Sequence, residues 1–133
     1  MLNVDPSKAP DPMIVPSVRV TDMARAVEFY TRVLDFDHAG TWPAMADPSY
    51  TMLRRRGDEL SLSSHAGDGV VGQKVTVLVD DVDALHAAFV ARGLDQRHRL
   101  ESPIHLGPTD QTWGTREFCT DDPDGNGIIF AQR

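Results

Sequence analysis

Three oxygen-bearing side chains alternate near the C-terminus, in the segment Asp122-Pro-Asp-Gly-Asn126. Alternating Asp and Asn residues are typical of calcium-binding loops, which place a glycine at the sixth position and a closing carboxylate at the twelfth. Here the glycine is fourth, and residues 127–133 contain no Asp or Glu. We therefore interpret 121–127 as the turn of a hairpin, in which Asx side chains bond their own backbone and glycines take positive φ angles.

Histidine and cysteine are the other residue types that could bind a metal or act in catalysis. The five histidines are His38, His65, His86, His98 and His105. His38, His65 and His105 are expected at strand ends or in loops, and the other two fit exposed positions. An imidazole can serve as a general base or a metal ligand, but these five lack the close spacing on one rigid element that favours a metal cluster. No nucleophile–histidine pair follows from the spacing, and Cys119 is interpreted as an inert buried thiol.

Composition limits the class of protein. The chain has 133 residues, of which 41% are hydrophobic, and this length suits one domain. No apolar run approaches the roughly 20 residues that cross a bilayer, so we expect no membrane association. The net charge of -7 would repel nucleic acid and attract cations. A single cysteine and an N-terminal segment without a signal-peptide pattern indicate a cytoplasmic protein.

The elements that must position these side chains occur in an order that repeats. The first series has a strand at 14–20, a helix capped by Thr21 or Asp22, and strands at 37–42, 49–54 and 60–64. The second has a strand at 75–79, a helix capped by Asp81 and ended by Gly93, and strands at 97–102, 115–120 and 127–132. Moving the first series by 59 positions places Val18 on Val77 and Tyr30 on Phe89.

The repeat predicts an α+β fold. We expect one domain at 13–133, built from two βαβββ modules at about 14–64 and 74–132 that form a curved mixed sheet around a groove. A proline-rich, flexible arm at 1–12 precedes it. A groove between two curved sheets is a natural place for a small ligand.

Several motifs in this order resemble one family. They are Val15-Pro-Ser-Val18, Val27-Glu-Phe-Tyr30, Val79-Asp-Asp-Val-Asp-Ala-Leu85, Trp113-Gly-Thr-Arg-Glu-Phe118 and Asp122-Pro-Asp-Gly-Asn126. Together they are similar to the vicinal oxygen chelate superfamily of glyoxalases, bleomycin-resistance proteins and ring-cleaving dioxygenases. The motifs around Trp113 and on the first strand are most similar to the bleomycin-resistance proteins. In that subgroup the motif lacks the residue that stands here as Thr115.

Enzymes of this superfamily hold a divalent ion with one ligand from each of four strands. The resemblance places those four positions at Val15, in the strand 60–64, at Lys74 and at Ile129. Aliphatic chains, hydroxyls and an ammonium group are poor ligands for such an ion. We therefore expect no metal or other cofactor. The alternative is a metal-dependent glyoxalase- or dioxygenase-type enzyme with unusual ligands, drawn from His38, His65, His105 and Glu117.

The resemblance implies a binding protein that leaves its ligand unaltered. Bleomycin-resistance proteins are homodimers that exchange N-terminal strands, and Pro16 stands at the place of the hinge. Two grooves at the dimer interface would hold a cationic or aromatic small molecule such as a bleomycin-type glycopeptide, by stacking on aromatic rings. The expected ligand-binding residues are Trp113, Gly114, Trp42, Tyr50, His38, Ser63, His65 and Glu117. A binding module for another small metabolite is a third possibility.

Overall fold

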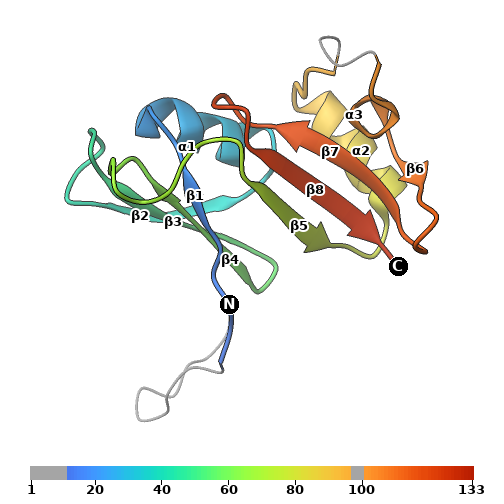
Figure 1. The fold of residues 1–133 in the computed structure, drawn as a ribbon, viewed down its shortest axis with the longest axis horizontal. Helices are drawn as coiled ribbons and strands as arrows, with labels where there is room; N and C mark the ends of the chain where they lie inside the picture. The colour runs from blue at the N-terminus through green and yellow to red at the C-terminus, as the bar shows by residue number, and fades with distance from the viewer. Residues whose placement is uncertain (1–11, 97–100) are drawn as a thin grey trace.

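Two four-stranded sheets lie side by side in the computed structural model, which describes residues 12–96 and 101–133 (Figure 1). The first sheet has the order β1-β4-β3-β2, from strands β1 (Ser17–Arg19), β2 (Asp37–Trp42), β3 (Tyr50–Arg55) and β4 (Asp58–Ser63). The second has the order β5-β8-β7-β6, from strands β5 (Lys74–Leu78), β6 (Thr109–Asp110), β7 (Arg116–Asp121) and β8 (Gly127–Gln132). None of the helices in the described part of the chain has the length and apolar character that a bilayer crossing needs.

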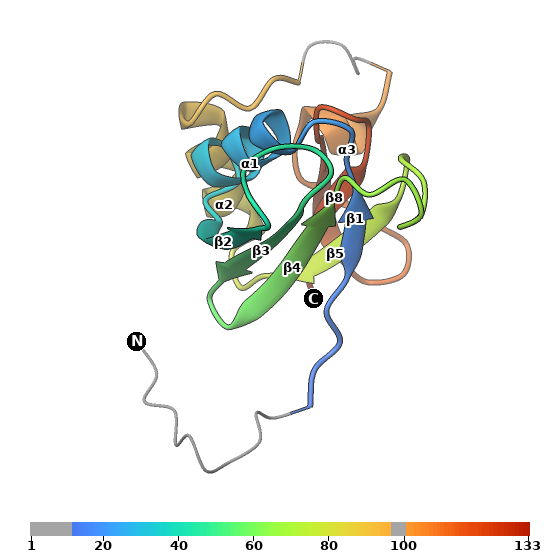
Figure 2. The ribbon, with the colours of Figure 1, turned by 90° about the vertical axis from the view of Figure 1, so that its left-hand side faces the viewer.

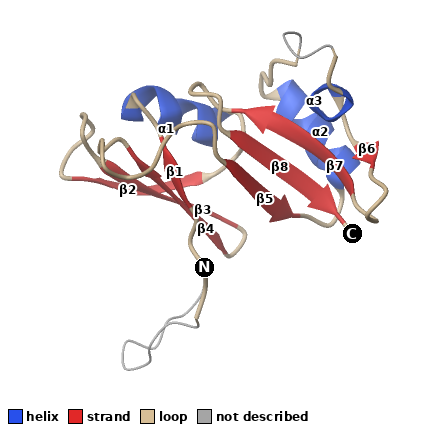
Figure 3. Cartoon of the chain, viewed as in Figure 1, coloured by secondary structure: helices blue, strands red, loops and turns tan. Residues whose placement is uncertain are grey.

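Helices cover one face of each sheet, which makes the fold α+β, as the repeat predicts (Figure 3). Helix α1 (Met23–Arg32) packs on the first sheet and α2 (Val82–Ala91) on the second. The parallel pairs β1–β4 and β5–β8 make both sheets mixed. We call the face of each sheet that points away from α1 or α2 its far face.

The two modules repeat the same local chemistry. Asp22 accepts a hydrogen bond from the backbone of Arg25, and Asp81 accepts the equivalent bond from Ala84, so each helix begins at a predicted cap. Gly93 follows α2 with φ +103°, and the backbone of Leu94 bonds the Phe89 carbonyl at 3.0 Å. This is the closing pattern in which glycine takes the left-handed conformation.

One predicted strand is not found in the part of its range that the structure describes. Of the range 97–102, residues 97–100 lie outside the described part, and residues 101 and 102 are not in a strand. A short helix, α3 (Pro103–Leu106), follows, and β6 pairs with β7 only at residues 109–110. Proline fits the first turn of a helix because its missing N–H would be unpaired there, which favours α3 at this point. Of the predicted arm at 1–12, only Pro12 is described.

The loop between β7 and β8 is a hairpin turn, as predicted. The Asp122 carboxylate accepts hydrogen bonds from the backbone N–H groups of Asp124 and Asn126, both at 2.9 Å, and Gly125 has φ +85°. The same carboxylate also accepts a bond of 2.7 Å from the hydroxyl of the fully buried Tyr30 in α1. The loop therefore joins the second module to the first.

Candidate functional site

Part of the expected site lies on the far face of the first sheet. Trp42 pairs with Tyr50, and Tyr50 pairs with Ser63. Residues directly opposite each other in a sheet share a face, so these three side chains are neighbours. Leu53 and Leu62, which alternate with them, are fully buried on the α1 side.

Trp42 forms an aromatic platform on this face. A Cβ atom added at Gly40 would lie 2.5 Å from Cη2 of the Trp42 indole, so the ring lies directly over the Gly40 backbone. The Trp42 residue is nevertheless 55% exposed. One side of the ring is thus supported by the chain, and the other is available for stacking with a flat ligand.

Ser63 and His65 have different environments. Ser63 is fully buried, and its hydroxyl donates to the Asp68 carboxylate at 2.6 Å. The same oxygen accepts a hydrogen bond from the backbone N–H of His65 at 3.2 Å. The hydroxyl therefore holds the loop after β4, whereas the His65 residue is exposed.

The structure does not bring His38 together with Trp42 and Tyr50. Strand alternation alone would place residues 38, 40 and 42 on one face, but the register shifts between His38 and Gly40. A bulge of this kind shifts the alternation of side chains, so residues two positions apart across it point to opposite faces of the sheet. His38 pairs with Leu53, and its Nε2 lies 2.7 Å from Oγ1 of Thr41, on the α1 side of the sheet.

The second module contributes Trp113 and Gly114 from the turn before β7. The backbone N–H of Gly114 bonds the Gln111 carbonyl at 3.1 Å, and Gly114 has φ +95°, a conformation suited to glycine. Trp113 is 68% exposed. The Oε2 atom of the buried Glu117 accepts a bond of 2.8 Å from the hydroxyl of Thr115, so the extra residue of the motif connects this turn to Glu117.

Arg116 holds the same turn against α2. Its guanidinium bonds the Asp83 carboxylate at 2.9 and 3.0 Å and the Asp110 carboxylate at 3.2 Å. These bonds, first to Asp83 and then to Asp110, raise the pKa of Arg116, and the bond from Arg116 lowers the pKa of Asp83. All three side chains are solvent-exposed to a large extent, so the pairs act mainly to orient the turn.

The two parts of the expected site are separated within one chain. Trp42 ends β2, the outer strand of the first sheet, and Trp113 follows β6, the outer strand of the second. Figure 1 shows β2 and β6 at opposite ends of the molecule. One copy of the chain therefore carries the two tryptophans beside the outer strands of different sheets.

A cavity of about 330 Å³ lies where the two sheets meet. Its lining includes Met13, Ile14 and Pro16 together with residues of β4 and β5. The N-terminal segment pairs with β4 as far back as Pro16, whose carbonyl accepts a hydrogen bond of 2.9 Å from the backbone N–H of Ser61. The described residues before Pro16 lead away from the two sheets (Figure 2). Ile14 in this stretch is 94% exposed.

The four positions that the resemblance assigns to metal ligands do not fit a divalent ion. Thr76 pairs with Ile129 and Lys74 with Gly127, which places Lys74 and Ile129 on the far face of the second sheet. In the first sheet, strand β4 is equivalent to β8, and it places Ser61 and Ser63 on the far face of that sheet. The ammonium group and the aliphatic chain have no lone pair to donate, and the Ser63 hydroxyl already donates to Asp68.

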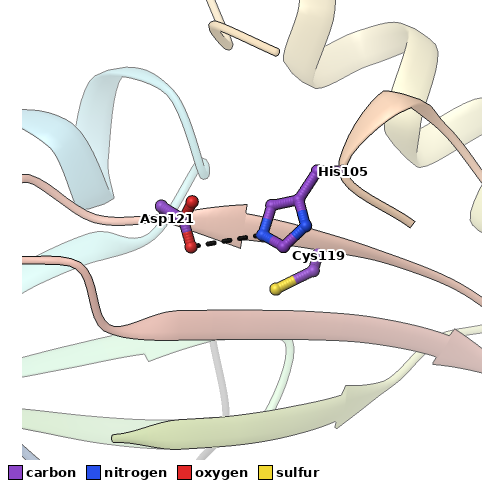
Figure 4. Close-up of side chains that lie close together, drawn as sticks. All are labelled: His105, Cys119 and Asp121. Carbon is purple, nitrogen blue, oxygen red and sulfur yellow. Dashed lines mark hydrogen bonds and ion pairs between the residues drawn. The ribbon is translucent and has the colours of Figure 1, made fainter. Parts of the chain in front are cut away.

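Sequence reasoning missed one cluster. The side chains of His105, Cys119 and Asp121 lie close together, with one ligand-type atom of each within 4.8 Å of the others (Figure 4). Cys119 and Asp121 alternate along β7, which was a visible signal. His105 reaches them from α3, an element that the sequence pattern did not predict.

Comparisons with known proteins agree with this architecture. A family profile described as the Glyoxalase/Bleomycin resistance protein/Dioxygenase superfamily matches residues 13–130. No curated protein sequence matches the chain significantly. A bleomycin-binding protein complexed with bleomycin has a similar structure, with a TM-score of 0.71 and 20% identity over 92% of this chain and 98% of that chain.

Two further solved structures are similar. A bleomycin resistance determinant encoded on the transposon Tn5 gives a TM-score of 0.72 and 20% identity, over 92% of this chain and 98% of that chain. TnmS3, an antibiotic binding protein from Streptomyces sp. CB03234, gives a TM-score of 0.69 and 26% identity, over 94% of this chain and 98% of that chain. At 20% identity the similarity concerns the fold.

Proposed function

Because the chain belongs to the glyoxalase/bleomycin resistance protein/dioxygenase superfamily, we propose that it binds a cationic or aromatic antibiotic, or a similar small molecule, and sequesters it unchanged. The observation that carries this proposal is the Trp42 indole, which lies over Gly40 with its outer side exposed on the far face of the first sheet. The similarity to TnmS3, an antibiotic binding protein, supports the same class of function.

The chemistry of the exposed groups favours a flat, positively charged ligand. Stacking on an indole contributes about 0.5–1.5 kcal/mol beyond the burial of apolar area, and its π-face also attracts cations. The net charge of -7 increases the local concentration of cations around the protein. The space over Gly40 is filled by the Trp42 ring, whereas a Cβ atom at Gly114 would meet nothing within 4 Å, which leaves space for a ligand ring beside Trp113.

We place the binding groove between two copies of the chain. Trp42 and Trp113 are on outer strands at opposite ends of one copy, so a homodimer is needed to bring one of each together. Met13 is 53% exposed and Ile14 is 94% exposed, and exposed apolar side chains of this size favour burial against a partner. In this proposal Pro16 is the hinge from which the N-terminal segment crosses to the partner, since proline cannot donate to a strand ladder.

Titration calorimetry with bleomycin tests the binding function. We expect binding at micromolar protein, with one ligand for each chain, and an unchanged ligand mass after incubation. Trp42→Ala and Trp113→Ala should each weaken binding by about 2- to 12-fold, from the loss of one stacking contact. Gly40→Val should weaken it similarly while retaining both tryptophans, because the new side chain displaces the Trp42 ring.

Val70→Ala is the matched control, because Val70 is an exposed apolar residue away from both tryptophans in the sequence. It should bind like the wild type. Absence of bleomycin binding at micromolar protein, or a chemically altered ligand, would contradict the proposal as stated. A parallel thermal-shift screen of other cationic and aromatic compounds would then identify a different ligand within the same class.

The dimer needs its own measurement. Sedimentation velocity should give a dimer for the full chain, and deletion of residues 1–13 should weaken the dimer and the binding of bleomycin together. A monomer that binds bleomycin with full affinity would show that the groove does not need a second copy. In that case the assignment of Trp42 and Trp113 to one groove would be wrong.

A further inference from the structure

His105, Cys119 and Asp121 form a cluster with the composition of a metal site. Nε2 of His105 lies 3.3 Å from Oδ1 of Asp121, and one ligand atom from each of the three residues is within 4.8 Å of the others (Figure 4). Zinc bonds of about 2.0–2.3 Å separate the ligand atoms of a tetrahedral site by roughly 3.3–3.7 Å. No pair of ligand atoms therefore needs to close by more than about 1.5 Å to reach this geometry.

The cluster is sheltered from solvent. Cys119 is 5% exposed, and the side chains of His105 and Asp121 are each 13% exposed. Gly127 leaves room beside the sulfur, since a Cβ atom there would lie 3.4 Å from Sγ of Cys119. A divalent cation bound here would balance the negative charges of a Cys119 thiolate and the Asp121 carboxylate.

Ser102 orients the imidazole. Its Oγ lies 2.7 Å from Nδ1 of His105, and this residue stands at the N-cap of α3 without making a capping bond. The hydroxyl can donate to Nδ1 when Nε2–H bonds Asp121, and it can accept from Nδ1–H when Nε2 binds a metal. Ligating histidines usually have such a partner on the second ring nitrogen.

We propose that His105, Cys119 and Asp121 bind one Zn²⁺ ion, or a similar divalent cation, with Ser102 as the positioning residue. Imidazole and thiolate are the donors that zinc prefers, and a carboxylate is an accepted third ligand. The thiol releases one proton to solvent when the metal binds. Three protein ligands leave a fourth position for water or a donor atom of a small molecule. The site uses residues other than those at the four superfamily positions, although Cys119 pairs with Ile129 and Asp121 with Gly127 beside Lys74, and it does not depend on the proposed antibiotic binding.

Cobalt is a direct spectroscopic probe for the site. The full chain, free of any histidine tag, would be titrated with Co²⁺ under reducing, oxygen-free conditions. We expect one Co²⁺ for each chain, a thiolate-to-cobalt charge-transfer absorption and the strong visible bands of tetrahedral cobalt. Zn²⁺ should displace Co²⁺ and raise the melting temperature of the protein.

Variants distinguish a built site from adventitious binding. Cys119→Ser should remove the charge-transfer band, and His105→Gln and Asp121→Asn should each lower the affinity at least about 10-fold. Ser102→Ala, which removes no helix cap, should lower it about 10- to 100-fold while the protein stays folded. Asp37→Asn, at an exposed carboxylate of the other module, is the matched control for Asp121→Asn and should bind like the wild type.

Two results would overturn the proposal. One is a wild-type titration without the charge-transfer band, or a band that persists in Cys119→Ser. The other is an unchanged Co²⁺ affinity in folded Ser102→Ala, which decides the question even if Cys119→Ser fails to fold. Bleomycin binding that survives in these variants would leave the proposed function intact, so the two proposals fail separately.

Discussion

Replacing Asn126 by alanine should destabilise the protein more than any exposed substitution in the same loop. The Asn126 side chain is fully buried and uses all of its hydrogen-bonding groups. Its Oδ1 accepts from the backbone N–H groups of Gly72 and Gln73 at 2.8 and 3.0 Å. Its Nδ2 donates to the Arg19 carbonyl and to the Asp122 carboxylate, both at 2.8 Å.

The expected loss in the free energy of unfolding follows from these four bonds. Three bonds to neutral groups contribute about 1 kcal/mol each, and the bond to the carboxylate contributes about 2 kcal/mol. Alanine leaves all four partners without this side chain, but Gly72 is exposed and water can replace part of the loss. We expect a decrease of about 3–4 kcal/mol, a large part of the total stability of a domain of this size.

Urea unfolding followed by far-UV circular dichroism measures this loss. Asn126→Asp should be at least as damaging, because it keeps the acceptor for Gly72 but places a second carboxylate 2.8 Å from Asp122. Pro123→Ala, at an exposed neighbour, should change stability by less than about 1 kcal/mol. A loss below about 1 kcal/mol in Asn126→Ala would refute the reasoning, since water would then replace all four bonds.

Three further substitutions test the packing around the modules. Tyr30→Phe should cost about 2 kcal/mol in urea unfolding, because it removes the bond to Asp122. Burial, then Asp122, raise the pKa of Tyr30 well above 10.0, so the folded state keeps a proton that the unfolded state loses. The stabilising effect of Tyr30 over Phe should therefore shrink as pH rises above about 10, and an unchanged difference there would contradict this assignment. Burial lowers the pKa of His86 below 6.5, so the unfolded state takes up a proton more readily than the folded state. The stability of the protein should therefore fall as pH decreases through about 6.5, and the melting temperature of His86→Gln should fall less over the same pH range. Gly93→Ala, at φ +103°, should cost about 1–2 kcal/mol by chemical denaturation, whereas Gly67→Ala should be nearly neutral.

The architecture was predictable because its signals are local. The caps at Asp22 and Asp81 and the apolar stripes of both helices recur at one spacing, and each is read within a few residues. The short elements 103–106 and 109–110 were not predictable in this way, since a helix of four residues and a strand of two have no periodicity. Their form depends on packing against β7.

Long-range geometry limited what could be predicted about the site. The bulge after His38 has no strong sequence signal, yet it decides which side of the sheet that imidazole occupies. His105 meets Cys119 and Asp121 only because α3 folds against β7. The placements of Trp42, Tyr50 and Trp113 in one groove stay predictions, because one chain holds them on two sheets.

The repeat preserves the fold but not the chemistry of the far faces. The equivalent registers place Tyr50 and Ser63 of the first module where the second has Glu117 and Ala131. The helix-facing positions are mainly apolar in both modules because each sheet must bury that face against its helix. The far faces carry no such constraint, so one presents an indole, a phenol and hydroxyls and the other a carboxylate and a thiol, with the exposed Trp113 in the turn before β7. A ligand that needs both kinds of surface must meet both sheets, and the placement of Trp42 and Trp113 beside outer strands at opposite ends of one chain is the physical reason to expect the groove between two copies.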